Sequence, residues 1–363
     1  MAALAMQRDR HVEIIDAVRG LAALSVAYLH CREISWIGMR AYWLQHPFDF
    51  SLSSIIAYAT FPVSYGSIGV PILFVISGYV IHRRAARMLA VGDLHFVTSS
   101  FLIRRFIRIY PTFVAAIGLT YICDMITRAY GIHQRLGDLS LSTFFWNIVA
   151  FQGVFAVPFG SNGPLWSLAV EVQFYIVYPI VLLLRMRIGP EKMLATASGL
   201  SVAGYYIFER NGIVAFPQYY FSWWLGAYLA DREARRDRLP SLWLLISALF
   251  MAAGCLCYSL QASFLSFMMW AIGFAPLLGF LIQRKHARLA PDSMLHRIGQ
   301  FSYSIYAAHL PIVLMLNTML FDGLKQQSIY WSLLMLLITL TFCYGFHLVA
   351  ERPSLALLKK IAR

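Results

Sequence analysis

The sequence is poor in charged residues for its length. Only 13% of its 363 residues are Asp, Glu, Lys or Arg, whereas hydrophobic residues make up 60%. Soluble domains carry about a quarter charged residues and are roughly half apolar. This composition excludes an ordinary soluble domain and predicts an all-α, polytopic integral membrane protein.

Other absences narrow the class further. The five cysteines show no metal-type spacing, so they are interpreted as small packing residues, and no metal site is expected. No low-complexity linker, soluble stretch longer than a loop, or internal repeat interrupts the chain, which predicts a single membrane domain over residues 1–363. The first apolar run contains Arg19 and lacks a small-residue cleavage site, so we expect it to be retained as a span.

About ten apolar runs approach the roughly 20 residues that a helix needs to cross a bilayer. The predicted transmembrane helices are Ile14–Cys31, Pro62–Ile81, Ile107–Met125, Pro164–Leu184, Met193–Phe208, Phe216–Ala230, Leu242–Leu260, Phe264–Ile282, Tyr303–Phe321 and Tyr330–Val349.

The basic residues predict the topology. The net charge of +13 is compatible in principle with a nucleic-acid partner, but the basic clusters alternate along the chain. They follow the second, sixth and eighth spans and end the chain, as HRRAAR, DREARRDR, QRKHAR and KKIAR. Positive residues collect on the cytoplasmic side of membranes. We therefore expect both termini in the cytoplasm and no nucleic-acid partner.

The first span contains three ionisable residues, in IDAVRGLAALSVAYLH. Arg19 and His30 lie about three helical turns apart, so both project from one face, about 16 Å apart along the axis. Asp16 lies one turn before Arg19 and is placed to pair with it. Ionisable residues inside membranes are costly and usually functional. The alternative is that Asp16 and Arg19 neutralise each other while His30 bonds a neighbouring carbonyl.

A second group lies in SNGPLWSLAVEVQFYIVYP. Ser167, Glu171 and Tyr175 follow one another at intervals of four residues, on one helix face. Glu171 lies about two turns, or ~11 Å, below the outer start of its span. His30 is expected at a similar depth and is therefore the predicted partner of this carboxylate.

Two further groups have two interpretations each. Arg104, Arg105 and Arg108 crowd the start of the third span, where they either touch lipid headgroups or clamp a phosphate. In FSYSIYAAHLP, Tyr306 and His309 lie on roughly one face, and His309 either binds substrate or satisfies a buried polar contact.

In order and placement these motifs resemble the membrane acyltransferase-3 family, whose members O-acylate surface polysaccharides, lipopolysaccharide O-antigens, Nod factors and periplasmic glucans. The motifs that carry the resemblance are Arg19 with His30, FVISGY at Phe74–Tyr79, Arg105 and Arg108 ahead of Tyr110 and Pro111, SLAVEVQFY at Ser167–Tyr175, FSYSIYAAH at Phe301–His309, and ERP at Glu351–Pro353. The chain looks like the short form, without the C-terminal hydrolase-like domain of some members.

The resemblance implies an O-acyltransferase of the bacterial inner membrane. Its donor would be cytosolic acyl-CoA, with acetyl the commonest acyl group in the family and succinyl an alternative. Its acceptor would be a hydroxyl of a cell-surface or exported polysaccharide or oligosaccharide, and membrane lipids would surround the enzyme. Direct transfer to the sugar and a two-step route through an acylated His30 both remain open.

The site residues take roles under this hypothesis. Arg104, Arg105 and Arg108 would hold the phosphates of CoA, and Arg19 the pantetheine arm or the thioester oxygen. His30, oriented by Glu171, would remove the proton of the acceptor hydroxyl. The predicted substrate-binding residues are Ser167, Tyr175, Tyr306 and His309.

Two other classes compete with this hypothesis. A proton-coupled transporter that exports a glycan or a small anion would also carry buried ionisable residues, although many transporters show internal repeats. A membrane sensor or scaffold would bind partners and never release an acylated product.

Overall fold

The computed structural model describes residues 2–93, 95–131, 135–283 and 293–361. Within these ranges the chain is helical between turns, without any β-strand. Eight helical stretches are long and apolar enough to cross a membrane, which confirms the predicted all-α, multi-pass membrane fold. They are Glu13–Ser35, Leu52–Ala90, Thr98–Tyr130, Leu165–Ile188, Leu242–Ser259, Ser263–Gln283, Ser302–Phe321 and Tyr330–Ile361.

Two of the ten predicted spans fold as helices but are less apolar than the rest. They are α8 (Pro190–Ile207), which contains Met193–Phe208 except its last residue, and α9 (Phe216–Ala234), which contains Phe216–Ala230. Neither is among the eight apolar stretches of the described chain. The number of spans predicted from the sequence is therefore higher by two than the number of these stretches.

The chain divides into two compact units. Unit 1 comprises residues 1–22, 68–103 and 170–300, and unit 2 comprises residues 23–67, 104–169 and 301–363. Three long helices contribute residues to both units, namely α1 (Ala2–Ser35), α5 (Thr98–Tyr130) and α7 (Leu165–Ile188). The single domain over residues 1–363 stays a prediction.

Unit 1 is held together by close helix crossings. Besides its share of the long helices it contains α4 (Gly69–Ala90), α8, the short η2 (Glu209–Asn211), α9, α10 (Leu242–Ser259), α11 (Ser263–Gln283) and α12 (Met294–Gln300). At the crossing of α4 and α9, a Cβ atom on Gly78 would lie 1.8 Å from the carbonyl oxygen of Trp223. One on Gly226 would lie 1.8 Å from that of Val75. Only glycine lets the two backbones approach this closely, as at other membrane helix crossings.

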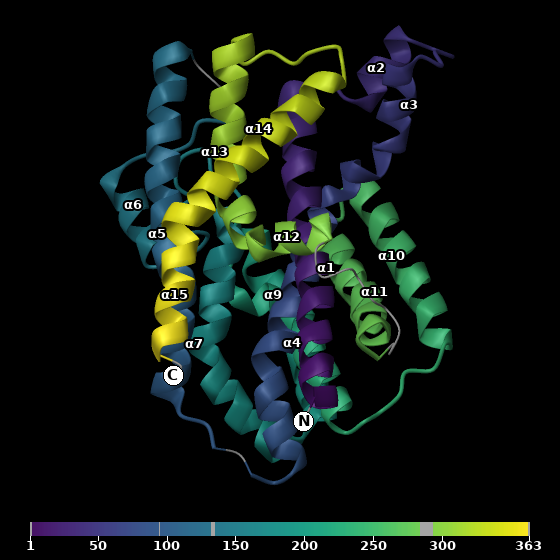
Figure 1. Ribbon diagram of the computed structural model, residues 1–363, viewed down its shortest axis with the longest axis vertical. Helices are drawn as coiled ribbons and strands as arrows, with labels where there is room; N and C mark the ends of the chain where they lie inside the picture. The colour runs from purple at the N-terminus through teal and green to yellow at the C-terminus, as the bar shows by residue number, and fades with distance from the viewer. Residues whose placement is uncertain (1, 94, 132–134, 284–292, 362–363) are drawn as a thin grey trace. The chain divides into compact units, whose positions relative to one another are not determined.

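Next to this crossing, α10 and α11 lie side by side as a helical pair, drawn in green in Figure 1. A buried apolar cluster joins α11 to α4 and α9, and it includes Val75, Tyr79, Leu229 and Phe274. This packing fixes the part of α4 that carries FVISGY.

Unit 2 contains the remaining helices. They are α2 (Met39–Gln45), α3 (Leu52–Ala59), η1 (Phe61–Ile68, of which Ile68 is assigned to unit 1), α6 (Leu141–Ile148), α13 (Ser302–Phe321), α14 (Tyr330–Phe346), η3 (His347–Glu351) and α15 (Arg352–Ile361). The end of α1 packs against α13 and α14 through Tyr28, Cys31, Leu314 and Met335. This contact places His30 of α1 beside α13.

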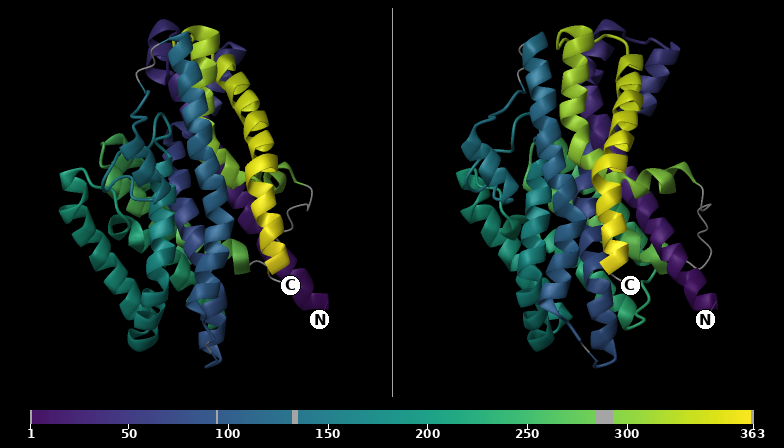
Figure 2. Two further views of the ribbon diagram at one scale, coloured as in Figure 1. Left: turned by 90° about the vertical axis from the view of Figure 1, so that its left-hand side faces the viewer. Right: turned by 60° about the vertical axis from the view of Figure 1, so that its left-hand side comes forward.

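The last helices of unit 2 form a nearly continuous yellow rod in Figure 2, in which α14 passes through the π-helical η3 into α15. Glu351 of the ERP motif accepts a hydrogen bond of 2.6 Å from Ser304 Oγ and pairs with His347 Nδ1 at 2.9 Å. Glu351 of the ERP motif therefore joins α13 to η3 within unit 2.

Candidate active site

Two histidines that are 279 residues apart in the sequence meet in unit 2. His30 Nδ1 lies 2.9 Å from His309 Nε2, and the rings are nearly parallel, with an interplanar angle of 20°. His309 is fully buried, whereas His30 is half-buried. The second nitrogen of His30, Nε2, has no hydrogen-bond partner among the described residues.

The hydrogen-bond pattern determines where the protons of this pair lie when both rings are neutral. His309 Nδ1 is 2.9 Å and 3.0 Å from the carbonyl oxygens of Ile305 and Tyr306, and carbonyls only accept. His309 Nδ1 therefore carries the proton, and its Nε2 accepts one from His30 Nδ1. His30 is then left with a lone pair on Nε2, the form that a general base requires.

The backbone beside His309 is shaped by Pro311 within α13. Proline has no N–H, so the helix leaves the carbonyl of Ala307, four residues earlier, without its usual partner. Asn162 of the same unit fills that place, because its side-chain amide donates 2.9 Å hydrogen bonds to Ala307 O and to Thr120 Oγ1. Asn162 thus stabilises the helical turn from which His309 projects.

We expect Asn162→Leu to lower the free energy of unfolding by about 1–3 kcal/mol, because it leaves a buried carbonyl without a donor. Thermal unfolding of the purified protein in detergent measures the change. The control is Asn211→Leu, since Asn211 is exposed and bonds only a carbonyl one turn earlier, and it should change stability little. Equal stability of the two variants would contradict the role of Asn162.

Tyr306 and Ser167 lie beside the histidine pair in unit 2. Ser167 Oγ donates to the carbonyl of Pro164 at 3.1 Å and has a single proton. Its 2.7 Å contact with Tyr306 must therefore be a bond that the Tyr306 hydroxyl donates. Both predicted substrate-binding side chains are buried and bonded to each other, which fixes the turn where α7 begins.

Glu171, the predicted partner of His30, lies in unit 1. Its Oε1 atom accepts hydrogen bonds from Ser77 Oγ, at 2.7 Å, and from the Tyr175 hydroxyl one turn along α7. Trp223 Nε1 in turn donates to Ser77 Oγ at 3.2 Å. The other carboxylate oxygen of Glu171, Oε2, accepts no hydrogen bond from the described residues. The Glu171 carboxylate is therefore held at one oxygen and open at the other. The pairing of Glu171 with His30 stays a prediction.

The predicted arginines are also in helices. Arg19 pairs with Asp16 one turn earlier at 3.8 Å, as expected from their spacing, and both side chains are half-buried. On α5, Arg105 and Arg108 are half-buried and Arg104 is exposed. Their roles in binding a donor stay predictions.

Sequence reasoning missed three contributors to these arrangements. Ser77 lies in the FVISGY motif and was not recognised as a hydrogen-bond donor to Glu171. Asn162 lies in SNGP and was not recognised as a donor to the carbonyl of Ala307. The third is the contact of His30 with His309. For Ser77 and Asn162, position inside a recognised motif was the available signal.

Comparison with known proteins agrees with the family resemblance that the sequence motifs indicate. A family model described as an acyltransferase domain matches residues 12–348, nearly the whole chain. No solved structure matches it.

Two relatives share about half of the chain. Peptidoglycan O-acetyltransferase OatA of Listeria monocytogenes is 27% identical over 201 residues, which cover 53% of this chain and 28% of OatA. YrhL of Bacillus subtilis, assigned by name alone to the peptidoglycan O-acetyltransferases, is 29% identical over 189 residues. Those residues cover 50% of this chain and 25% of YrhL, so the chain spans about a quarter of the length of these relatives.

Proposed function

Because the chain belongs to the membrane acyltransferase-3 family, we propose that it transfers an acyl group, acetyl in the first instance, from acyl-CoA to a hydroxyl of a glycan. The observation that carries the proposal is the hydrogen bond between His30 and His309, which leaves the Nε2 lone pair of His30 available as a base. The O-acetyltransferase names of its relatives support acetyl as the group transferred.

The reaction proceeds in one step under this proposal. His30 Nε2 takes the proton of the acceptor hydroxyl while the hydroxyl oxygen attacks the thioester carbonyl carbon. The new C–O bond forms, the C–S bond breaks, and the CoA thiolate takes up the proton from His30 as it leaves. His309 holds the His30 ring in the tautomer that this step needs.

The remaining residues bind or stabilise charge. Arg19 stabilises the thioester oxygen as negative charge develops on it, and Arg105 and Arg108 hold phosphates of CoA, with Arg104 nearby. Glu171 keeps its proposed role, which is to stabilise the positive charge that His30 carries after it takes the proton. The acceptor is a cell-surface or exported glycan, and peptidoglycan fragments are the first to try because OatA is named a peptidoglycan O-acetyltransferase. The bacterial relatives support an inner-membrane location.

The proposal is tested with the purified wild-type protein in detergent, acetyl-CoA or succinyl-CoA, and a panel of peptidoglycan fragments and oligosaccharides. We expect release of free CoA thiol that depends on one of these acceptors, together with an acylated product seen by mass spectrometry. If the protein retains a covalent acyl group after incubation with the donor alone, the direct route is wrong and the two-step route takes its place.

The same preparation distinguishes the transporter. In proteoliposomes, flux of a glycan or anion without consumption of acyl-CoA would overturn the proposal in favour of transport. Binding of acceptor without turnover of either donor, under conditions where the protein stays folded, would favour the sensor.

A further inference from the structure

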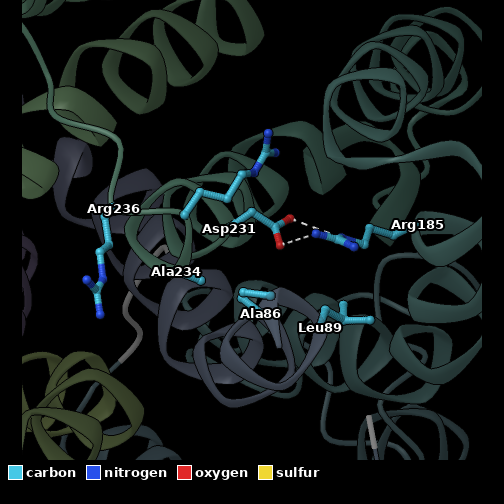
Figure 3. Close-up of a pocket in the computed structure, with 8 residues that line it drawn as sticks. Ala86, Leu89, Arg185, Asp231, Ala234 and Arg236 are labelled. Carbon is cyan, nitrogen blue, oxygen red and sulfur yellow. Dashed lines mark hydrogen bonds and ion pairs between the residues drawn. The ribbon is translucent and has the colours of Figure 1, made fainter. Parts of the chain in front are cut away.

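Unit 1 contains an open pocket of about 530 Å³ at the ends of three helices. Its lining combines the last residues of α4, Arg185 of α7 and the end of α9 with the two residues that follow α9, Arg235 and Arg236. Arg185, Arg235 and Arg236 thus contribute three guanidinium groups to the lining of this pocket, and Asp231 contributes the one carboxylate, in a space within the range of small-ligand sites. Figure 3 shows Arg185 and Arg236 on opposite sides of Asp231.

Asp231 holds one of these arginines in a fixed orientation. It accepts hydrogen bonds from Arg185 Nη2 at 2.6 Å and Nε at 3.2 Å, and His82 Nε2 lies 3.2 Å from its Oδ1 atom. Burial raises the pKa of the Asp231 carboxyl, but the hydrogen bonds and charges of His82 and Arg185 outweigh burial and hold that pKa below its ordinary value. The carboxylate stays ionised at neutral pH. Arg185 is therefore anchored, and its Nη1 donors remain to bind a ligand.

Arg236 occupies a backbone position that suits glycine. It follows the end of α9 with φ of +61°, and the bonds from its own N–H to Glu233 O and from the Asp237 N–H to Arg232 O form a Schellman motif. An L-residue pays a steric cost in this left-handed conformation. Among the described residues Arg236 makes no ion pair, so neither the helix cap nor a salt bridge accounts for an arginine here.

We propose that this pocket binds a phosphate group, through Arg236 and the anchored Arg185, with Arg235 assisting. Guanidinium groups match phosphate geometry with paired hydrogen bonds. The three positive charges of the lining also outnumber the single negative charge of Asp231. Arg235 is partly engaged by Glu191, at 2.8 Å, which leaves Arg236 as the principal free cation of the pocket among the described residues. The carboxyl ends of α4 and α9 carry partial negative charge, but that effect is weaker than a charged hydrogen bond.

Two sources supply a phosphate to such a pocket. One is coenzyme A, whose assignment here rests on the proposed function, and the other is the headgroup of an anionic phospholipid. Phosphate binding itself does not depend on acyl transfer.

The test compares Arg236→Gly with Arg238→Gly. Arg236→Gly removes the guanidinium and relieves the backbone, so the protein should remain folded with equal or higher thermal stability. Arg238→Gly removes the same charge two residues later, from a side chain that is exposed like that of Arg236 but does not line the pocket. Calorimetry in lipid-free detergent measures the Kd of CoA without an acyl group, and native mass spectrometry measures retention of phosphatidylglycerol from mixed micelles.

We expect Arg236→Gly to weaken one of these two ligands roughly tenfold, as loss of a charged hydrogen bond predicts, with Arg238→Gly near wild type. Weaker CoA binding identifies the nucleotide as the source, and weaker lipid retention alone identifies the headgroup. If neither ligand distinguishes the two variants, the pocket is no phosphate site. Because these measurements need no turnover, they remain readable if the proposed transfer reaction is never observed.

Discussion

Replacing His30 with alanine is expected to lower kcat for acyl transfer by about 10²- to 10⁴-fold, the range that general bases contribute. The protein should still fold, because His30 is half-buried and its only hydrogen-bond partner among the described residues is His309. Thiol release under saturating donor and acceptor measures kcat, and size-exclusion chromatography checks folding. An active His30→Ala enzyme would rule out His30 as the base.

Substitution of His309 should lower kcat nearly as much as substitution of His30, although His309 acts through His30. His309→Leu removes the acceptor that fixes the His30 tautomer, whereas the side-chain oxygen of His309→Gln can accept the same proton and should restore part of kcat. The double variant of His30→Ala and His309→Leu should be no slower than His30→Ala alone, since the pair acts as one unit. His347→Gln serves as a control, because His347 bonds Glu351 instead. Wild-type kcat in His309→Leu would contradict the tautomer argument.

Gly226→Leu is expected to have the largest effect on folding. Even its Cβ atom would lie 1.8 Å from Val75 O and 2.7 Å from Tyr79 N, so α4 and α9 would have to separate. Overpacking of a core usually costs about 1–3 kcal/mol, and displacement of two helix backbones should reach the upper end of that range or exceed it. The measurements are the yield of monodisperse protein and its thermal midpoint in detergent.

The matched control for Gly226→Leu is Gly199→Leu on α8, where a Cβ atom would meet nothing within 4 Å. This variant should be recovered at the wild-type yield. Gly78→Leu should reproduce the defect of Gly226→Leu from the opposite side of the crossing. Normal yield and thermal midpoint in Gly226→Leu would mean that α4 and α9 do not cross this closely.

The sequence predicted the helices well because the membrane imposes a simple rule on their length and composition. Eight of the predicted spans correspond to apolar helical stretches, and the weak ones, in α8 and α9, are those where polar residues dilute the apolar run. The Asp16–Arg19 and Glu171–Tyr175 contacts were also accessible, since both partners lie on one helix at spacings of three or four residues.

Contacts between distant helices were not accessible from the sequence. His30 was assigned Glu171 as its partner because the two were expected at the same depth, and depth says nothing about which helices are neighbours. The contact with His309 depends on α1 packing against α13, and no local pattern encodes that choice. Gly78 was likewise noted only as part of a motif, whereas the structure shows that its missing side chain is what matters.

The contact between Asn162 and the helix turn at Pro311 constrains the order in which these two residues can be substituted during evolution. While Pro311 is present, loss of Asn162 strands the carbonyl of Ala307. A residue with an N–H at position 311 would restore the ordinary helical bond to that carbonyl, which has a second lone pair and so tolerates both donors at once. Substitution at 311 therefore has to precede substitution at 162. A lineage that retains the proline is committed to the asparagine as well, although 149 positions separate them.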